Sequence, residues 1–130
     1  MSYSEEQIKE FKEKADKWDA LENEISACYG IKSTKMKQII GKREANGVNT
    51  HFLWVEKNED FTIQLSIQSV DEIINSIEAG DGYQVKQTKV LVVNDTPKYL
   101  RAVPDGGTEN NLDSLPDADE IYSRIQKIIK

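Results

Sequence analysis

The most regular pattern of apolar and polar positions lies between residues 61 and 67. Apolar and polar residues alternate there in the order Phe61, Thr62, Ile63, Gln64, Leu65, Ser66 and Ile67. A period of two is typical of a strand with one buried face and one wet face. Shorter runs predict strands over residues 36–42 and 50–56, and the Asn46–Val48 step between them has the Asn-Gly chemistry of a hairpin turn. We therefore expect an antiparallel meander over residues 36–67.

Further strands are expected over residues 83–87, 89–94 and 98–103. Pro97 separates the last two, because proline cannot donate a hydrogen bond to a strand ladder. Two helices flank these strands. The first follows Ser69, which has the capping-box spacing to Glu72, and it is expected to stop at Gly80. The second covers residues 118–130, with Asp117 as its predicted N-cap.

The first helix of the chain is predicted over residues 4–29, where Ser4 and Gln7 also have capping-box spacing. Its apolar residues recur at helical steps and form a narrow stripe: Ile8, Phe11, Ala15, Trp18 and Ile25. Such a stripe suits a helix that covers its own domain or an arm that forms a homo-oligomer. Both interpretations remain open from the sequence.

The order of these elements predicts an α+β fold with a mainly antiparallel sheet, a central helix, a long N-terminal helix and a C-terminal helix. We divide the chain into an N-terminal amphipathic helix, residues 1–30, and a single α+β domain, residues 31–130. A chain of 130 residues is long enough to bury a hydrophobic core without disulfides.

The composition of the chain argues against several classes of protein. A net charge of −6 argues against a non-specific nucleic-acid binder, which needs a surplus of Lys and Arg. One cysteine, Cys28, leaves no intrachain disulfide, and no apolar run approaches the roughly twenty residues that span a bilayer. The polar start MSYSEEQ is unlike a signal peptide. We expect a cytoplasmic protein without membrane contact.

The charges are unevenly distributed. Acidic residues gather between positions 105 and 120 without any basic residue, whereas Lys32, Lys35, Lys37, Lys42 and Arg43 gather earlier. Oppositely charged patches attract, so the two regions are expected to meet within the fold or across subunits.

Residues 97–116, PKYLRAVPDGGTENNLDSLP, form the least ordinary stretch. Prolines, a Gly-Gly pair and adjacent asparagines interrupt both helices and strands, so the backbone must turn repeatedly. We predict a short strand that leads into a structured polar loop.

This stretch also carries a family resemblance. The chain from about Ile39, which begins with IIGKR, to Pro116 resembles a small bacterial and phage family of unknown function. The matching ending consists of Tyr99, Leu100, Arg101, Asp105, Gly106, Asn110, Asn111, Leu112, Leu115 and Pro116. The resemblance implies the same fold and an important loop, and it implies no activity.

No catalytic constellation is present in the sequence. There is one histidine, His51, and the chain has no GxSxG, HExxH or phosphate-cradling glycine motif. His51 has no identifiable partner, which favours a structural role over a general base. The spacing of the acidic residues does not match an EF-hand. We therefore predict a protein that is not an enzyme and has no metal site or cofactor.

The candidate ligand-binding residues lie mainly in the loop. A guanidinium binds phosphate or carboxylate, and asparagine amides both donate and accept hydrogen bonds. The candidates are Arg101, Asp105, Asn110 and Asn111, with Tyr99 or Trp54 as an aromatic contact and Arg43 on a second side of the sheet. The competing interpretation is that Asn110 and Asn111 tie down the loop backbone while Arg101 pairs with Asp105 or Asp113.

Two functions follow from these observations. The first is non-enzymatic binding of a small anionic, nucleotide-like ligand, as in a phage protein that sequesters a host immune signal. The alternative is an acidic interaction module or inhibitor that docks on a basic protein partner.

Overall fold

The structure is a computed structural model that describes residues 4–24, 36–57, 62–86, 88–104, 107 and 109–129. Its main sheet has five strands in the order β3-β2-β1-β4-β5. The strands are β1 (Met36–Ala45), β2 (Val48–Lys57), β3 (Ile63–Ser69), β4 (Gly82–Val85) and β5 (Thr88–Lys89). All neighbouring pairs are antiparallel except β1 and β4, which are parallel. The α+β fold with a mainly antiparallel sheet is therefore confirmed.

The β1–β2 hairpin closes through the predicted Asn-Gly turn. Asn46 and Gly47 have φ angles of 53° and 77°. Left-handed backbone at both central positions matches the right-handed twist of the flanking strands, and Asn and Gly adopt it at the least cost. The turn therefore fixes the register in which Ala45 faces Val48.

Helix α2 (Val70–Glu78) follows β3 directly and begins with the predicted capping box. The Ser69 hydroxyl accepts from the Glu72 amide, and the Glu72 carboxylate accepts from the Ser69 amide. Its buried residues Ile73 and Ile74 face the sheet. This helix connects β3, at one edge of the sheet, to β4, which lies next to β1 on the side away from β2. Such a crossover is required because β4 is parallel to β1.

A second, two-stranded sheet pairs β6 (Leu91–Val93) with β7 (Tyr99–Arg101). The segment predicted as one strand over residues 89–94 is thus divided between β5 and β6. Val90, at the division, is buried, and its amide donates to the carbonyl of Tyr83. The strand predicted over 98–103 is shorter than expected and leads toward a 3-10 helix, η2 (Asn111–Ser114), which was not predicted.

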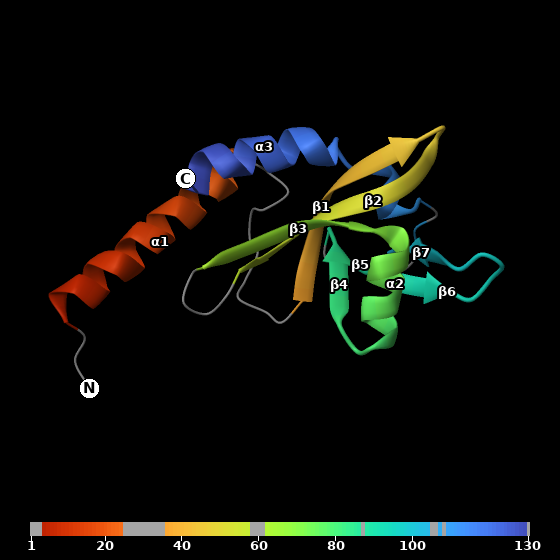
Figure 1. Cartoon of the computed structure of the whole chain (residues 1–130), viewed down its shortest axis with the longest axis horizontal. Coiled ribbons are helices and arrows are strands. Elements are labelled where there is room, and N and C mark those ends of the chain that lie inside the picture. The colour runs from red at the N-terminus through yellow and green to blue at the C-terminus, as the bar shows by residue number, and fades with distance from the viewer. Residues whose placement is uncertain are drawn as a thin grey trace.

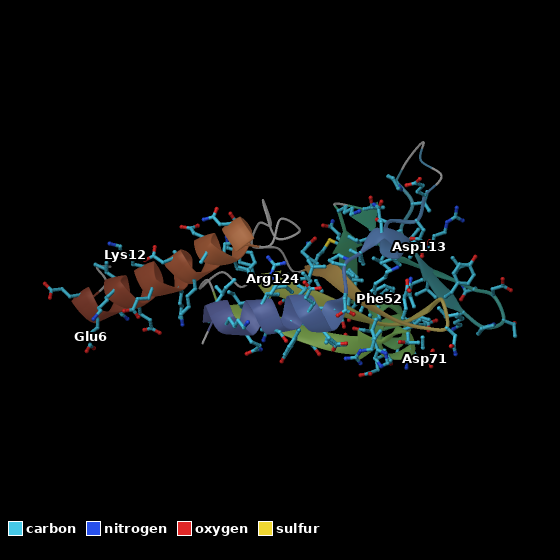
Figure 2. All side chains as sticks on the ribbon, turned by 90° about the horizontal axis from the view of Figure 1, so that it is seen from above. Glu6, Lys12, Phe52, Asp71, Asp113 and Arg124 are labelled. Atoms are coloured by element: carbon cyan, nitrogen blue, oxygen red, sulfur yellow. The ribbon has the colours of Figure 1, made fainter. Side chains whose placement is uncertain are left out.

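Helices cover both faces of the main sheet. Figure 1 shows α3 (Ala118–Ile129) above the sheet, α2 below it, and α1 (Glu5–Glu24) projecting from the body near the C-terminal end of α3. Both views show this projection, and Figure 2 places Glu6 and Lys12 on the projecting part. No helix among the described residues is long and apolar enough to cross a membrane.

The core is divided into two clusters by the sheet. Strand β2 is buried on both faces, because Phe52 and Trp54 join the cluster under α2 while Leu53 and Val55 join the cluster under α1 and α3. Alternate side chains of a strand point to opposite faces, so a continuous apolar run serves both clusters.

Helix α1 contributes Trp18 and Leu21 to the second cluster, where both are buried beside Ile121 and Ile125 of α3. This packing matches the interpretation of α1 as a helix that covers its own domain. Ile8 remains 56% exposed, and Ile25 lies outside the described residues. Self-association through α1 stays a prediction, and while α1 is docked Trp18 is not available to a partner.

Candidate functional site

The polar loop after β7 is organised by its asparagines. The side-chain oxygen of Asn110 accepts from the amides of Ala102 and Leu112, at 3.0 and 3.2 Å, and so caps η2. The Asn111 amide donates to the carbonyl of Ala102, and its side chain donates to the Thr88 hydroxyl. Both residues therefore tie the loop to its surroundings, as one of the two sequence interpretations predicts. Asp105 lies outside the described residues.

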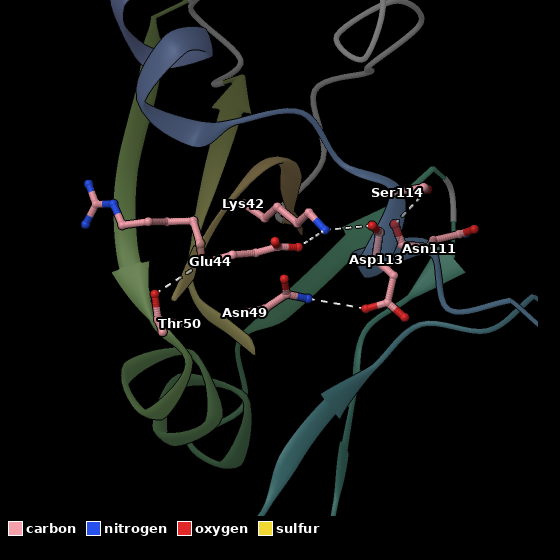
Figure 3. Close-up of polar contacts among 8 residues, drawn as sticks. Lys42, Glu44, Asn49, Thr50, Asn111, Asp113 and Ser114 are labelled. Atoms are coloured by element: carbon pink, nitrogen blue, oxygen red, sulfur yellow. Dashed lines mark hydrogen bonds and ion pairs between the residues drawn. The ribbon is translucent and has the colours of Figure 1, made fainter. Parts of the chain in front are cut away.

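Lys42 and Arg43 of the basic segment meet the acidic segment within the fold, one of the two arrangements left open by the sequence. The Lys42 ammonium donates to the backbone carbonyl of Asp113 and to the Glu44 carboxylate, and the Asn49 amide donates to Asp113 Oδ1 at 3.3 Å (Figure 3). The Lys42 amide also donates to the carbonyl of Pro116. These contacts fix η2 and the segment after it against the β1–β2 hairpin.

Arg43 pairs with Asp119 at the first turn of α3. Its Nε and terminal nitrogen donate to the two carboxylate oxygens at 3.1 and 2.6 Å. The hydrogen bonds lower the pKa of Asp119 and raise the pKa of Arg43. Arg43 is thus engaged in an internal ion pair, which counts against its predicted role in ligand binding.

Trp54 is 8% exposed and lies in the core under α2. Its indole nitrogen donates to Gln68 Oε1 at 2.7 Å, and the Tyr83 hydroxyl donates to the same oxygen at 2.9 Å. The Lys37 ammonium lies 5.2 and 5.3 Å from the two ring centroids, and burial raises the pKa of Tyr83. Trp54 therefore packs against its own chain rather than offering a ring to a ligand.

A cavity of about 220 Å³ opens between the hairpin turn, the start of α2, β7 and η2. Its lining residues are Val48, Asn49, Phe52, Val70, Tyr99, Leu100, Asn110, Leu112 and Asp113. The walls are mostly apolar or aromatic, with two amides and one carboxylate. This combination, an apolar hollow with a few fixed polar groups, is typical of a small-molecule site.

The polar groups of the cavity differ in what they can still bind. The Asn110 oxygen is used by the backbone, and its side-chain nitrogen has no hydrogen-bond partner among the described residues. Asp113 accepts from Asn49 through Oδ1 only. The site therefore offers a donor from Asn110 and an acceptor from Asp113 Oδ2.

Arg101 is the last residue of β7 and follows the cavity residue Leu100 in the sequence. Strand alternation places Tyr99 and Arg101 on one face and buried Leu100 on the other, and both outward residues are exposed. Arg101 makes no side-chain hydrogen bond or ion pair within the described residues, so the tie to Asp113 is not formed. Asp105, the other partner considered from the sequence, lies outside those residues.

The structure brings together only some of the predicted site residues. Tyr99 and Asn110 line the cavity and Arg101 follows the lining residue Leu100 on β7, whereas Asn111, Trp54 and Arg43 are engaged elsewhere. Asn49 and Asp113 also line the cavity, and neither is among the site residues predicted from the sequence. The position of Asn49 directly after the hairpin turn could have indicated a contact with another segment, because a hairpin tip projects away from the centre of its sheet.

Other reactive side chains do not assemble a second site. The Nδ1 atom of His51 lies 2.9 Å from the Thr50 hydroxyl, and the ring is half-buried. No group of three or more His, Cys, Asp or Glu residues within the described ranges is placed to hold a metal ion. Cys28 lies outside these ranges.

Residues 54–116 match a family model described as Protein of unknown function (DUF3892). The match runs from β2 to the segment after η2, so it includes Tyr99, Asn110 and Asp113 but not the hairpin tip. Part of the chain is thus similar to an uncharacterised domain family, over a shorter range than the resemblance from Ile39 suggests. No curated protein and no solved structure matches this chain.

Proposed function

We propose that the protein binds a small nucleotide-like ligand without changing it chemically. The cavity beside Arg101 is the observation that carries this proposal. A flat ring contacts Tyr99 and Phe52, while Asp113 and Asn110 offer an acceptor and a donor to its edge. An anionic group of the same ligand reaches Arg101 outside the cavity.

The volume of the cavity sets the size of the buried part. Sites that enclose a whole drug-sized ligand have volumes of about 300–1,000 Å³. The cavity here is smaller, about 220 Å³. Only a ring such as a nucleobase fits inside, which leaves the sugar and phosphate at the surface, where Arg101 is exposed.

The carboxylate of Asp113 favours one class of ring. A carboxylate only accepts hydrogen bonds, and carboxylates recognise exocyclic amino groups such as that of cytosine. Adenine, guanine and cytosine carry such a group and uracil does not. We therefore expect amino-bearing nucleotides to bind more tightly than uridine nucleotides.

Thermal-shift screening followed by calorimetry tests this function. The panel contains the four nucleoside monophosphates, the four nucleosides and inorganic phosphate, and binding raises the melting temperature with ligand concentration. Arg101→Ala is expected to weaken a monophosphate about ten- to a hundredfold, the equivalent of one charge-assisted hydrogen bond, and to leave the nucleoside unaffected.

Asp113→Asn is the second variant, since it keeps the shape of the side chain and removes the charge. It is expected to reduce the preference for amino-bearing bases. Lys127→Ala, an exposed cation on α3 across the sheet, is the matched control. Absence of binding across the panel, or binding that neither site variant changes, contradicts the proposal.

We extend this proposal to a biological setting suggested by the bacterial and phage family resemblance. A phage protein that binds a nucleotide signal without cleaving it removes that signal from a host immune pathway. Expression of the chain in a bacterium with nucleotide-signalled defence is then expected to restore plaque formation, and Arg101→Ala is expected to abolish the effect. Unchanged plaque numbers contradict this role.

A further inference from the structure

Strand β3 forms one edge of the main sheet as the described strands define it. It pairs with β2 along its inner side, from Ile63 facing Lys57 to Ser69 facing His51. Within the described residues, no other strand pairs with it. An edge strand presents a row of unused amide and carbonyl groups, which is a template for another strand.

Natural edge strands usually carry features that prevent such pairing, including shortness, charge, proline and bulges. The opposite edge of this sheet has two of them, because β5 is only two residues long and ends in the exposed Lys89. Strand β3 has none. Its seven residues, IQLSIQS, contain no charge, proline or glycine, and no bulge interrupts its pairing with β2.

The sequence of β3 is self-complementary in one antiparallel register. When Ser66 faces Ser66 of a second copy, Leu65 faces Ile67 and Gln64 faces Gln68. Leu65 and Ile67 then form an apolar pair on one side of the sheet, where Ile63 faces Ser69 at the ends of the strand, and the glutamine amides meet on the other side. A two-fold symmetric interface requires this kind of self-matching surface.

Side chains on both faces of β3 have surface or polar atoms left for this contact. Ile63, Leu65 and Ile67 pack against the cluster under α3 but are only partly buried, so part of their apolar surface is left to cover. On the other face, Gln68 Oε1 accepts from Trp54 and Tyr83, which fixes the amide and leaves its nitrogen to donate. Gln64 is exposed and has no partner among the described residues.

We propose that two copies of this chain pair through β3, antiparallel and centred on Ser66. The result is a continuous sheet with five strands from each copy. This interface differs from the α1 seam considered from the sequence.

Cross-linking at the symmetry axis tests the register. Directly opposed residues of an antiparallel pair have Cα atoms about 4.5–5.5 Å apart, which is within the disulfide range of about 4.4–6.8 Å. In a full-length Cys28→Ser background, Ser66→Cys is expected to form a disulfide-linked dimer under mild oxidation. Gln64→Cys is the control, because its two copies lie four residues, about 13 Å, apart along the strand.

Light scattering tests the association itself. The unmodified chain is expected to have twice the mass of one 14.8 kDa chain. Ser66→Lys places two like charges opposite each other and is expected to give a monomer. Gln64→Lys adds a charge elsewhere on the same edge and is also expected to weaken the dimer, and circular dichroism checks that both variants fold.

Ile8→Glu distinguishes an interface at β3 from one at α1, because Ile8 is a large exposed apolar residue of the projecting helix. The dimer is expected to persist in this variant. Any one of four results overturns the proposal. The unmodified chain is monomeric, or the dimer is lost in Ile8→Glu. Alternatively, the dimer persists in both folded lysine variants, or cross-linking is equal at positions 64 and 66.

Discussion

The ion pair between Arg43 and Asp119 shows how one residue pair ties the α3 terminus to the sheet. Two hydrogen bonds from the guanidinium stabilise the charged carboxylate and lower its pKa below the ordinary value of 3.8. A lowered folded-state pKa means that this stabilisation is present above the unfolded pKa and is lost as pH falls through the folded value. Both groups are solvent-exposed, so the contribution is small and salt-sensitive.

We predict that Arg43→Gln raises the pKa of Asp119 toward its ordinary value, because the guanidinium hydrogen bonds are the main cause of its lowering. Carbon-13 NMR of the carboxyl groups across an acid titration measures this change directly. Lys127→Gln, which removes a cation from the same helix without touching Asp119, is the control. An unchanged Asp119 titration in Arg43→Gln means that the guanidinium is not the cause.

Gly41 marks a close approach of two backbones. A Cβ atom at this position would lie 2.9 Å from the Cα atom of Ala118, and the next residue, Lys42, donates from its amide to Pro116. Backbone atoms cannot move aside as a flexible side chain can. We predict that Gly41→Ala lowers the free energy of unfolding by about 1–3 kcal/mol, measured by urea denaturation.

The control for this variant is Ser123→Ala on the exposed surface of α3, which is expected to change stability by less than about 0.5 kcal/mol. Equal stability of Gly41→Ala and the unmodified chain contradicts the close contact.

At the candidate site, residue types predicted which side chains are chemically suited to bind a ligand. They did not predict which other residues of the chain these side chains contact. Tyr99, Arg101 and Asn110 could be proposed because aromatic, guanidinium and amide groups suit ligands. The engagement of Asn111 by Thr88 depends on long-range packing that one sequence does not reveal. The same holds for Asn49 and Asp113, which are 64 positions apart and meet only after the hairpin docks on η2.

At the scale of elements, local signals were the most informative. The alternation in β3 and the Asn-Gly turn identified the meander because both depend on neighbouring residues. The division at Val90 was missed because Val90 stays bonded to Tyr83 of β4 while the next residue, Leu91, pairs with Arg101 of β7. The parallel pairing of β1 with β4 was also not predicted, since it depends on where α2 returns the chain.

The capping box of α2 provides a prediction at this scale. Ser69 satisfies the Glu72 amide, which has no partner within the first helical turn. Ser69→Ala is expected to lower the free energy of unfolding by about 1 kcal/mol, measured by urea denaturation. Ser123→Ala again serves as the control, because it removes a hydroxyl from a helix surface without removing a cap. A loss no larger than that of the control contradicts a stabilising cap.

At the scale of the whole molecule, the sheet separates two hydrophobic clusters that pack against different helices. The cavity and Arg101 lie on the side of α2 and the second sheet, while α1 and α3 cover the other face. Strand β3 is at the edge between them. The proposed ligand site, the packing of α1 on α3 and the proposed β3 interface therefore involve different residues, and each can be disturbed separately.

Trp18 tests this separation, because it anchors α1 on the face remote from the cavity. It is 2% exposed, its indole nitrogen donates to Glu22 at 2.8 Å, and the Lys57 ammonium lies 5.0 Å from its ring centroid. Removing a buried tryptophan side chain leaves a void, so Trp18→Ala is expected to cost about 3–5 kcal/mol. Urea denaturation measures the loss, and hydrogen exchange over residues 5–24 reports the release of α1.

Lys12→Ala is the control, since this exposed residue lies on the projecting part of the same helix and is expected to change neither measurement. If the Trp18→Ala variant is still folded, its affinity for a ligand identified by the nucleotide panel is expected to stay within about twofold of that of the unmodified chain. The reason is that no cavity residue packs against Trp18. Rapid exchange in α1 together with unchanged affinity supports two independent faces. A parallel loss of affinity shows instead that the anchoring of α1 is coupled through β2 to the cavity.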